Sequence, residues 1–137
     1  MKPTVPLPYW LALGLMVLET GYVLWNVALD LIIRILPSSH QYLDPDLVAF
    51  IRSVSWFQDT VFFLAAAAAC VAVWLFLGRS VWVLAAYGAQ VFLSKADWLM
   101  SGFNGVEMFT TQGYISLTYQ TVVMGLLIWL SYRETLD

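Results

Sequence analysis

Three polar side chains lie inside one long apolar stretch, residues 9–36. Glu19, Asn26 and Asp30 interrupt a run that is otherwise rich in leucine, valine, alanine and aromatic residues. On an α-helix these three side chains fall within about 40° of one another. Carboxyl groups inside a membrane helix can bind a cation, carry a proton or hold a neighbouring helix. The spacing therefore predicts a functional polar face on an apolar helix.

Further candidate site residues lie in the other apolar stretches of the chain. They are Asp59, Gln90, Lys95, Asp97 and Gln120. Polar groups are costly to expose to lipid tails, so the polar faces of the helices are expected to meet. The product would be one acid-lined cleft with Glu19 and Gln90 as its floor. We expect it to be closed near the chain termini and open towards the opposite side.

The role of each polar residue has alternatives. Lys95 lies about 140° from the face of Gln90 and Asp97, so it either snorkels to the membrane interface or crosses to a carboxylate. Asp30 and Asp59, which lie at a similar depth, are its expected partners.

Glu19 is either a proton- or cation-coupling acid, or a neutral carboxyl that accepts a hydrogen bond from Gln90 or contacts a backbone carbonyl. Hydrogen bonds between helices are the favoured role of Asn26, Gln90 and Gln120.

Composition favours a bilayer as the solvent of this chain. Of 137 residues, 61% are hydrophobic and 11% are charged, whereas soluble domains have about 25% charged residues. The apolar stretches predict helices at about 9–36, 45–77, 81–100 and 114–132. The stretch 45–77 is longer than a bilayer needs, so its first turns are expected to kink or to lie outside the hydrocarbon. The predicted fold is all-α: a single domain, residues 1–137, forming an antiparallel four-helix transmembrane bundle in a multi-pass membrane protein.

Several function classes are excluded by residue counts. With one cysteine, Cys70, the chain cannot form an internal disulfide, and with one histidine, His40, it cannot build a bis-histidine haem or a histidine-rich metal site. We expect no metal and no cofactor. No basic run is present, so nucleic acid is not an expected partner. Lys2, Arg79 and Arg133 fall on the side of the termini, which favours cytoplasmic termini.

Two short segments resemble known families. The opening PYWLALGLMVLE resembles the start of small multidrug-resistance transporters, which place one acidic residue in their first helix; Glu19 would be that residue. The order LDLIIRILP, SWFQD and GRSVW resembles the sterol isomerase and sigma-2-like four-helix group. That resemblance implies a ligand pocket with intramembrane acids, for which Asp30 and Asp59 are the candidates. Both resemblances cover only these segments.

Three function classes remain open at this point. Small size and the lack of a catalytic motif favour a non-enzymatic accessory subunit of a larger membrane complex. The clustered acids favour a binder or proton-coupled transporter of a small hydrophobic, amphipathic or cationic ligand, which as a transporter would require a homodimer. An intramembrane isomerase-like enzyme is the least favoured class. The expected partners are the lipid bilayer and another membrane protein or a second copy of the chain.

Overall fold

The computed structural model describes residues 5–105, 107 and 109–137, and every element in this part of the chain is helical. The elements are α1 (Leu7–Ile35), a 3-10 helix η1 (Pro37–Tyr42), α2 (Pro45–Ser53), α3 (Trp56–Leu77), α4 (Val83–Phe103) and α5 (Thr111–Tyr132). The predicted all-α class is confirmed. Within the described residues, three helices, α1, α3 and α5, are long and apolar enough to cross a membrane.

The stretch 45–77, expected as one helix with a kink or an outlying first part, forms two helices. The first, α2, begins after Asp44, whose side chain caps its N-terminus. It ends before Val54, which is extended. Ser55 then caps α3 by accepting a hydrogen bond from the backbone N–H of Gln58 at 3.2 Å. A serine that satisfies a free N–H starts a new helix, and this new start turns the chain between α2 and α3.

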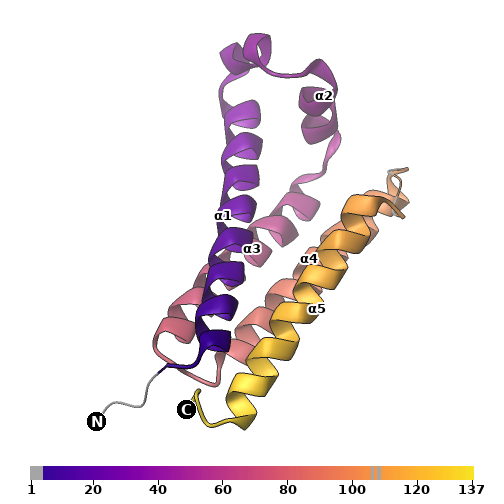
Figure 1. Cartoon of the computed structure of the whole chain (residues 1–137). Helices are drawn as coiled ribbons and strands as arrows, with labels where there is room; N and C mark the ends of the chain where they lie inside the picture. The colour runs from indigo at the N-terminus through magenta and orange to yellow at the C-terminus, as the bar shows by residue number, and fades with distance from the viewer. Residues whose placement is uncertain (1–4, 106, 108) are drawn as a thin grey trace.

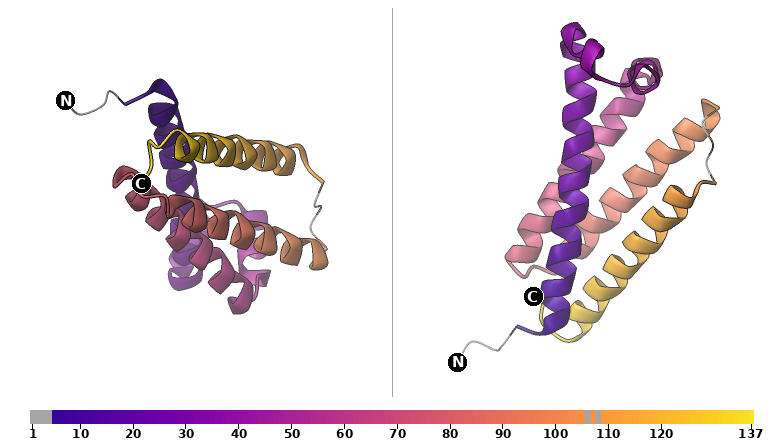
Figure 2. Two further views of the ribbon diagram at one scale, coloured as in Figure 1. Left: turned by 90° about the horizontal axis from the view of Figure 1, so that it is seen from below. Right: turned by 45° about the horizontal axis from the view of Figure 1, so that its top comes forward.

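The helices diverge from one end of the molecule towards the other. Figures 1 and 2 show the start of α1, the α3–α4 turn and the C-terminal tail at one end, with α2 at the opposite end. We call these the terminal end and the α2 end. α4 runs antiparallel to α3 beside it, whereas α1 and α5 are close at the terminal end and separate towards the α2 end.

The main apolar core fills the terminal end. Its fully buried side chains come from four helices and include Ala12, Met16, Ala72, Phe76, Val83, Tyr87, Val123, Leu127 and Leu130. Phe76 is 0% exposed and stacks on Tyr9 with 4.6 Å between the ring centroids. The C-terminal tail joins this core through Leu136, and the Asp137 backbone N–H donates to the carbonyl of Arg79. Packing thus fixes the terminal end and sets the angle at which the helices diverge.

The α2 end has a much smaller apolar cluster. Ile33 of α1 packs against Val48 and Ile51 of α2. The remaining buried positions at this end are polar, with Asp30, Gln58 and Asp59 all shielded from solvent. Buried polar groups require partners, so the structure here depends on which partners they find.

Candidate functional site

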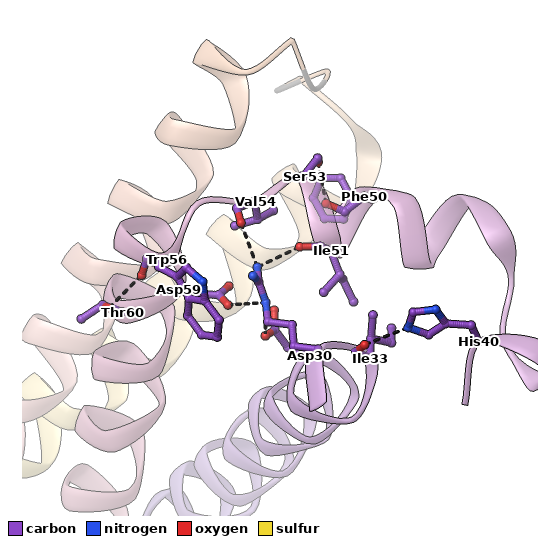
Figure 3. Close-up of polar contacts among 11 residues, drawn as sticks. Asp30, Ile33, His40, Phe50, Ile51, Ser53, Val54, Trp56, Asp59 and Thr60 are labelled. Carbon is purple, nitrogen blue, oxygen red and sulfur yellow. Dashed lines mark hydrogen bonds and ion pairs between the residues drawn. The ribbon is translucent and has the colours of Figure 1, made fainter. Parts of the chain in front are cut away.

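Arg34 lies at the centre of the polar network near the α2 end. Its Nε atom lies 3.0 Å from Asp30 Oδ1 and 2.7 Å from Asp59 Oδ2. Its Nη2 atom donates to the backbone carbonyl oxygens of Ile51 at 2.8 Å and Val54 at 2.9 Å. Figure 3 shows Asp30, Asp59, Ile51 and Val54 arranged around these dashed contacts. One guanidinium thereby joins α1, the end of α2 and the start of α3.

The position of Arg34 follows from local sequence. Arg34 is four residues after Asp30, so both lie on one face of α1. The rigid, planar guanidinium has several N–H donors and can serve a carboxylate and a carbonyl at once. The ring of Trp56 adds a cation–π contact, with its centroid 4.7 Å from the guanidinium carbon. The Arg34 side chain is only 9% exposed, so these contacts are largely shielded from water.

Four helices surround a hollow of about 190 Å³ next to this network, which we call the acid pocket. Its polar lining residues are Asn26, Asp30, Gln58, Asp59, Asp97 and Ser101. Its apolar lining residues are Leu47, Phe50, Ile51, Val54 and Phe62. The hollow therefore combines three carboxylate side chains with an apolar wall that includes two phenylalanine rings.

Gln58 connects α3 to the side of the acid pocket that α4 forms. Its Nε2 atom donates to Asp97 Oδ1 at 3.1 Å and to Ser101 Oγ at 2.8 Å, and its Oε1 atom accepts from Asn104 at 3.2 Å. Gln58 is on α3 and its partners are on or just after α4. These bonds hold the Asp97 carboxylate towards α3, where it lines the pocket.

A second polar cluster surrounds Glu19, closer to the main core. Glu19 Oε2 accepts from the Tyr87 hydroxyl at 2.7 Å, and Oε1 accepts from Gln120 Nε2 at 2.9 Å. The Tyr119 hydroxyl donates to the backbone carbonyl of Leu15 close by. Glu19 thus ties α1 to both α4 and α5, just above the apolar core.

Glu19 also lines a groove between α1 and α5, which we call the α1–α5 groove. It has a volume of about 310 Å³, and its lining residues are Leu18, Glu19, Tyr22, Gln112, Ile115, Ser116 and Tyr119. At its mouth Gln112 Nε2 donates to the Tyr22 hydroxyl at 3.1 Å. This groove shares no lining residue with the acid pocket.

The Glu19 cluster predicts a stability change. Replacing Tyr87 with phenylalanine removes the hydroxyl donor but keeps the ring, which is 1% exposed. We expect a loss of about 1–2 kcal/mol, the range for a hydrogen bond to a charged or intramembrane acceptor. Unfolding by sodium dodecyl sulfate, followed by circular dichroism, measures it. Tyr22→Phe, which alters an exposed hydroxyl, is the matched control; equal losses in both variants would contradict a structural role for the Tyr87–Glu19 bond.

The predicted site residues are divided between two polar clusters, and a third hollow of about 360 Å³ between α4 and α5 shares Asp97 and Ser101 with the acid pocket and Gln112 and Ser116 with the α1–α5 groove. Asn26, Asp30, Asp59 and Asp97 line the acid pocket. Glu19 and Gln120 belong to the other cluster, so Glu19 is not the floor of a cleft that contains the aspartates. The separation arises because the helices diverge. At the level of Glu19, α1 contacts α4 and α5, whereas at the level of Arg34 it contacts α2 and α3.

Two expected contacts are replaced by others. The ion-pair partner of Asp30 and Asp59 is Arg34, and Lys95 instead lies with its Nζ atom 5.9 Å from the ring centroid of Trp98. Lys95 is half-buried and lines hollows between α4 and α5.

Gln120 forms the hydrogen bond between helices that was expected of it, whereas Asn26 and Gln90 differ from expectation. The carboxyl of Glu19 is bound by Tyr87 and Gln120 rather than by Gln90, which is buried on α4. Asn26 donates to the Tyr22 carbonyl of its own helix, so that bond does not join two helices.

Arg34 is the main site residue that the sequence reasoning missed. Arg34 is not among the predicted site residues, although the Asp30–Arg34 spacing is that of a helical ion pair. Tyr87 was missed because a tyrosine in an apolar stretch resembles an ordinary core residue, and no spacing signal relates it to Glu19. Gln58 was noticed as polar but not as the residue that positions Asp97.

Among the described residues, no group of three or more histidine, cysteine, aspartate or glutamate side chains is placed to hold a metal ion. Comparison with protein-family models, with curated proteins and with solved structures gives no match. Function is therefore inferred from the geometry of the pockets and the chemistry of their lining residues.

Proposed function

We propose that this chain is a membrane protein whose acid pocket binds a small amphipathic ligand with a positive charge. The carboxylates of Asp30, Asp59 and Asp97 line one hollow, and Arg34 pairs with the first two. Three carboxyl groups share one guanidinium, so acidic oxygen atoms remain for the ammonium group of a ligand. This excess of carboxylates over cations around one hollow is the observation that carries the proposal.

The rest of the pocket wall suits the apolar part of such a ligand. Leu47 and Phe50 of α2 and Phe62 of α3 line the same hollow as the aspartates. Phenylalanine faces also attract cations. A volume of about 190 Å³ is below the usual range for drug-sized ligands, which favours a small amine with a short apolar or aromatic tail.

In this proposal α4 crosses the membrane as a fourth span beside α1, α3 and α5. Support comes from α4 lying antiparallel along α3, with Gln90 buried and Asp97 bound to Gln58. These two polar groups thus face the protein rather than lipid. The result is the antiparallel four-helix bundle expected from the sequence, and the basic residues favour cytoplasmic termini.

Binding of a matched pair of compounds tests the function. The full chain, purified in phosphatidylcholine nanodiscs, is titrated with phenylbutylamine and with the uncharged phenylbutanol. The amine is expected to bind more tightly, and Asp97→Asn is expected to weaken its binding about tenfold through loss of one nearby charge. Asparagine retains an Oδ1 acceptor for Gln58, so the wall of the pocket is preserved.

The control is Glu134→Gln, which removes a carboxylate from an exposed position in the tail. Its binding of phenylbutylamine should match that of the unaltered chain. Equal binding of the amine and the alcohol would contradict a cation site. The same conclusion would follow if Asp97→Asn and Glu134→Gln had equal effects.

A non-enzymatic accessory subunit is the second proposal, and a different feature favours it. The α1–α5 groove is largely apolar and has the carboxylate of Glu19 at its base. A helix of a membrane partner with one polar side chain would be a suitable occupant. A larger protein that co-purifies with the chain from its native membrane in a fixed ratio would favour this proposal over the first.

A further inference from the structure

All polar partners of Arg34 belong to the wall of the acid pocket. Its Nε atom contacts the carboxylates of Asp30 and Asp59, and its Nη2 atom contacts the carbonyl oxygens of Ile51 and Val54. Each of these four residues also lines the hollow. A ligand cation that enters the pocket therefore lies beside the residues whose carboxylates and carbonyl groups contact the guanidinium.

This overlap makes Arg34 a competitor of the ligand. The guanidinium lies against Asp59, which is 2% exposed, and against Asp30, which is 6% exposed. Buried carboxylates require a cation or hydrogen-bond donors. Arg34 meets that requirement when the pocket is empty, and an ammonium group close to the same carboxylates meets it when a ligand is bound.

Arg34 also holds α2 in place. The carbonyl of Ile51, in the last turn of α2, accepts from the backbone N–H of Val54 at 3.3 Å and from Arg34 at 2.8 Å, and Arg34 also donates to the carbonyl of Val54 just beyond the helix. The apolar contacts that attach α2 to α1 form a small cluster of Ile33, Val48 and Ile51, with Leu43 and Leu47 packed against it. Phe50 of α2 lines the acid pocket, so α2 covers the hollow and Arg34 secures its C-terminal end.

We propose that Arg34 is the internal counter-ion of the acid pocket and a latch for α2. A ligand cation that binds Asp30 and Asp59 displaces the guanidinium. The displaced Arg34 releases the carbonyl oxygens of Ile51 and Val54, and α2 loosens over the occupied pocket. This inference rests on the proposed cation-binding function. In it, Arg34 controls both the affinity of the acid pocket for the ligand cation and the attachment of α2 over the pocket.

Two variants of Arg34 test the latch in the full chain in phosphatidylcholine nanodiscs. Arg34→Gln removes the competing charge, and we expect phenylbutylamine to bind about tenfold more tightly, with phenylbutanol unaffected. Arg34→Lys keeps a cation but lacks the fork that reaches several acceptors. We expect the α2 amides of this variant to exchange hydrogen faster than those of the unaltered chain.

Hydrogen exchange of α2 supplies a readout that does not depend on affinity. In the unaltered chain phenylbutylamine should accelerate exchange of the amides in Pro45–Ser53, and phenylbutanol should not. In Arg34→Lys exchange should already be fast without ligand, which keeps the test valid if Arg34→Gln fails to fold.

The outcomes separate the latch from the pocket function. If phenylbutylamine binds the unaltered chain in an Asp97-dependent way but Arg34→Gln binds no more tightly, the latch is wrong and the cation site stands. Slower exchange of α2 on binding the amine also contradicts the latch. If the amine does not bind the unaltered chain or either Arg34 variant, the pocket function and the latch are both wrong.

Discussion

Replacement of Arg34 by methionine is expected to lower the free energy of unfolding by about 3–5 kcal/mol, the usual loss when one member of a buried ion pair is removed. The change leaves Asp30 and Asp59 without their cation, the carbonyl oxygen of Val54 loses the Arg34 donor, and that of Ile51 keeps only the backbone N–H of Val54. Methionine has a similar length, so the loss reflects charge and hydrogen bonding more than volume. Titration with sodium dodecyl sulfate in mixed micelles, followed by circular dichroism, measures the change.

The matched control is Arg52→Met, since Arg52 is an exposed residue of α2. We expect its effect to stay within about 0.5 kcal/mol, as for most surface substitutions. A triple variant, with Arg34→Met, Asp30→Asn and Asp59→Asn, should lose less than the single variant, because no unpaired charge then remains buried. If the two methionine variants lose equal stability, the network around Arg34 does not hold the α2 end together.

Phe76→Ala should produce the second large effect. Phe76 is fully buried and stacks on Tyr9 at the terminal end. Phenylalanine to alanine changes in water-soluble cores lower stability by about 3–5 kcal/mol. Here we expect about 2–4 kcal/mol, because an apolar solvent reduces the hydrophobic part and leaves mainly the loss of packing. The same titration measures it.

Phe92→Ala provides the control for this prediction. Phe92 lies on α4 and is 74% exposed, so its ring has few protein contacts to lose. Its unfolding free energy should stay close to that of the unaltered chain. If Phe92→Ala lowered the free energy of unfolding as much as Phe76→Ala, the buried and the exposed ring would contribute equally to stability. That result would contradict the prediction.

The two large predictions concern opposite ends of the molecule, and the contrast is informative. The terminal end is held by close packing of apolar side chains around Phe76. The α2 end is held chiefly by charge and hydrogen bonds around Arg34, with a small apolar cluster beside it. Polar contacts can be exchanged for those of a ligand, whereas a packed core cannot reorganise without loss of contacts. The acid pocket therefore lies at the end of the molecule where a ligand can replace polar contacts within the protein.

Local sequence determined the elements of this protein. Apolar runs of sufficient length predicted helices that can cross a membrane, because the length needed is set by the thickness of the bilayer. The helix start predicted at residue 45 is confirmed by α2, whose N-terminus is capped by Asp44 through chemistry that involves only neighbouring residues. The polar residues of the acid pocket were identified from their cost in an apolar helix. For the stretch 45–77 the sequence predicted a kink or first turns outside the hydrocarbon rather than two helices, since a serine within an apolar run is also compatible with a continuous helix.

The tertiary structure decided which polar groups meet. Helical phase placed Glu19, Asn26 and Asp30 on one face of α1, but phase alone does not give the angle between helices. That angle results from side-chain packing at the terminal end, which spreads the helices and separates Glu19 from the acid pocket. The choice of Arg34 rather than Lys95 as partner of Asp59 likewise depends on where α2 and α3 bring their carbonyl oxygens and carboxylate. Such contacts join residues far apart in the chain, and no local pattern encodes them.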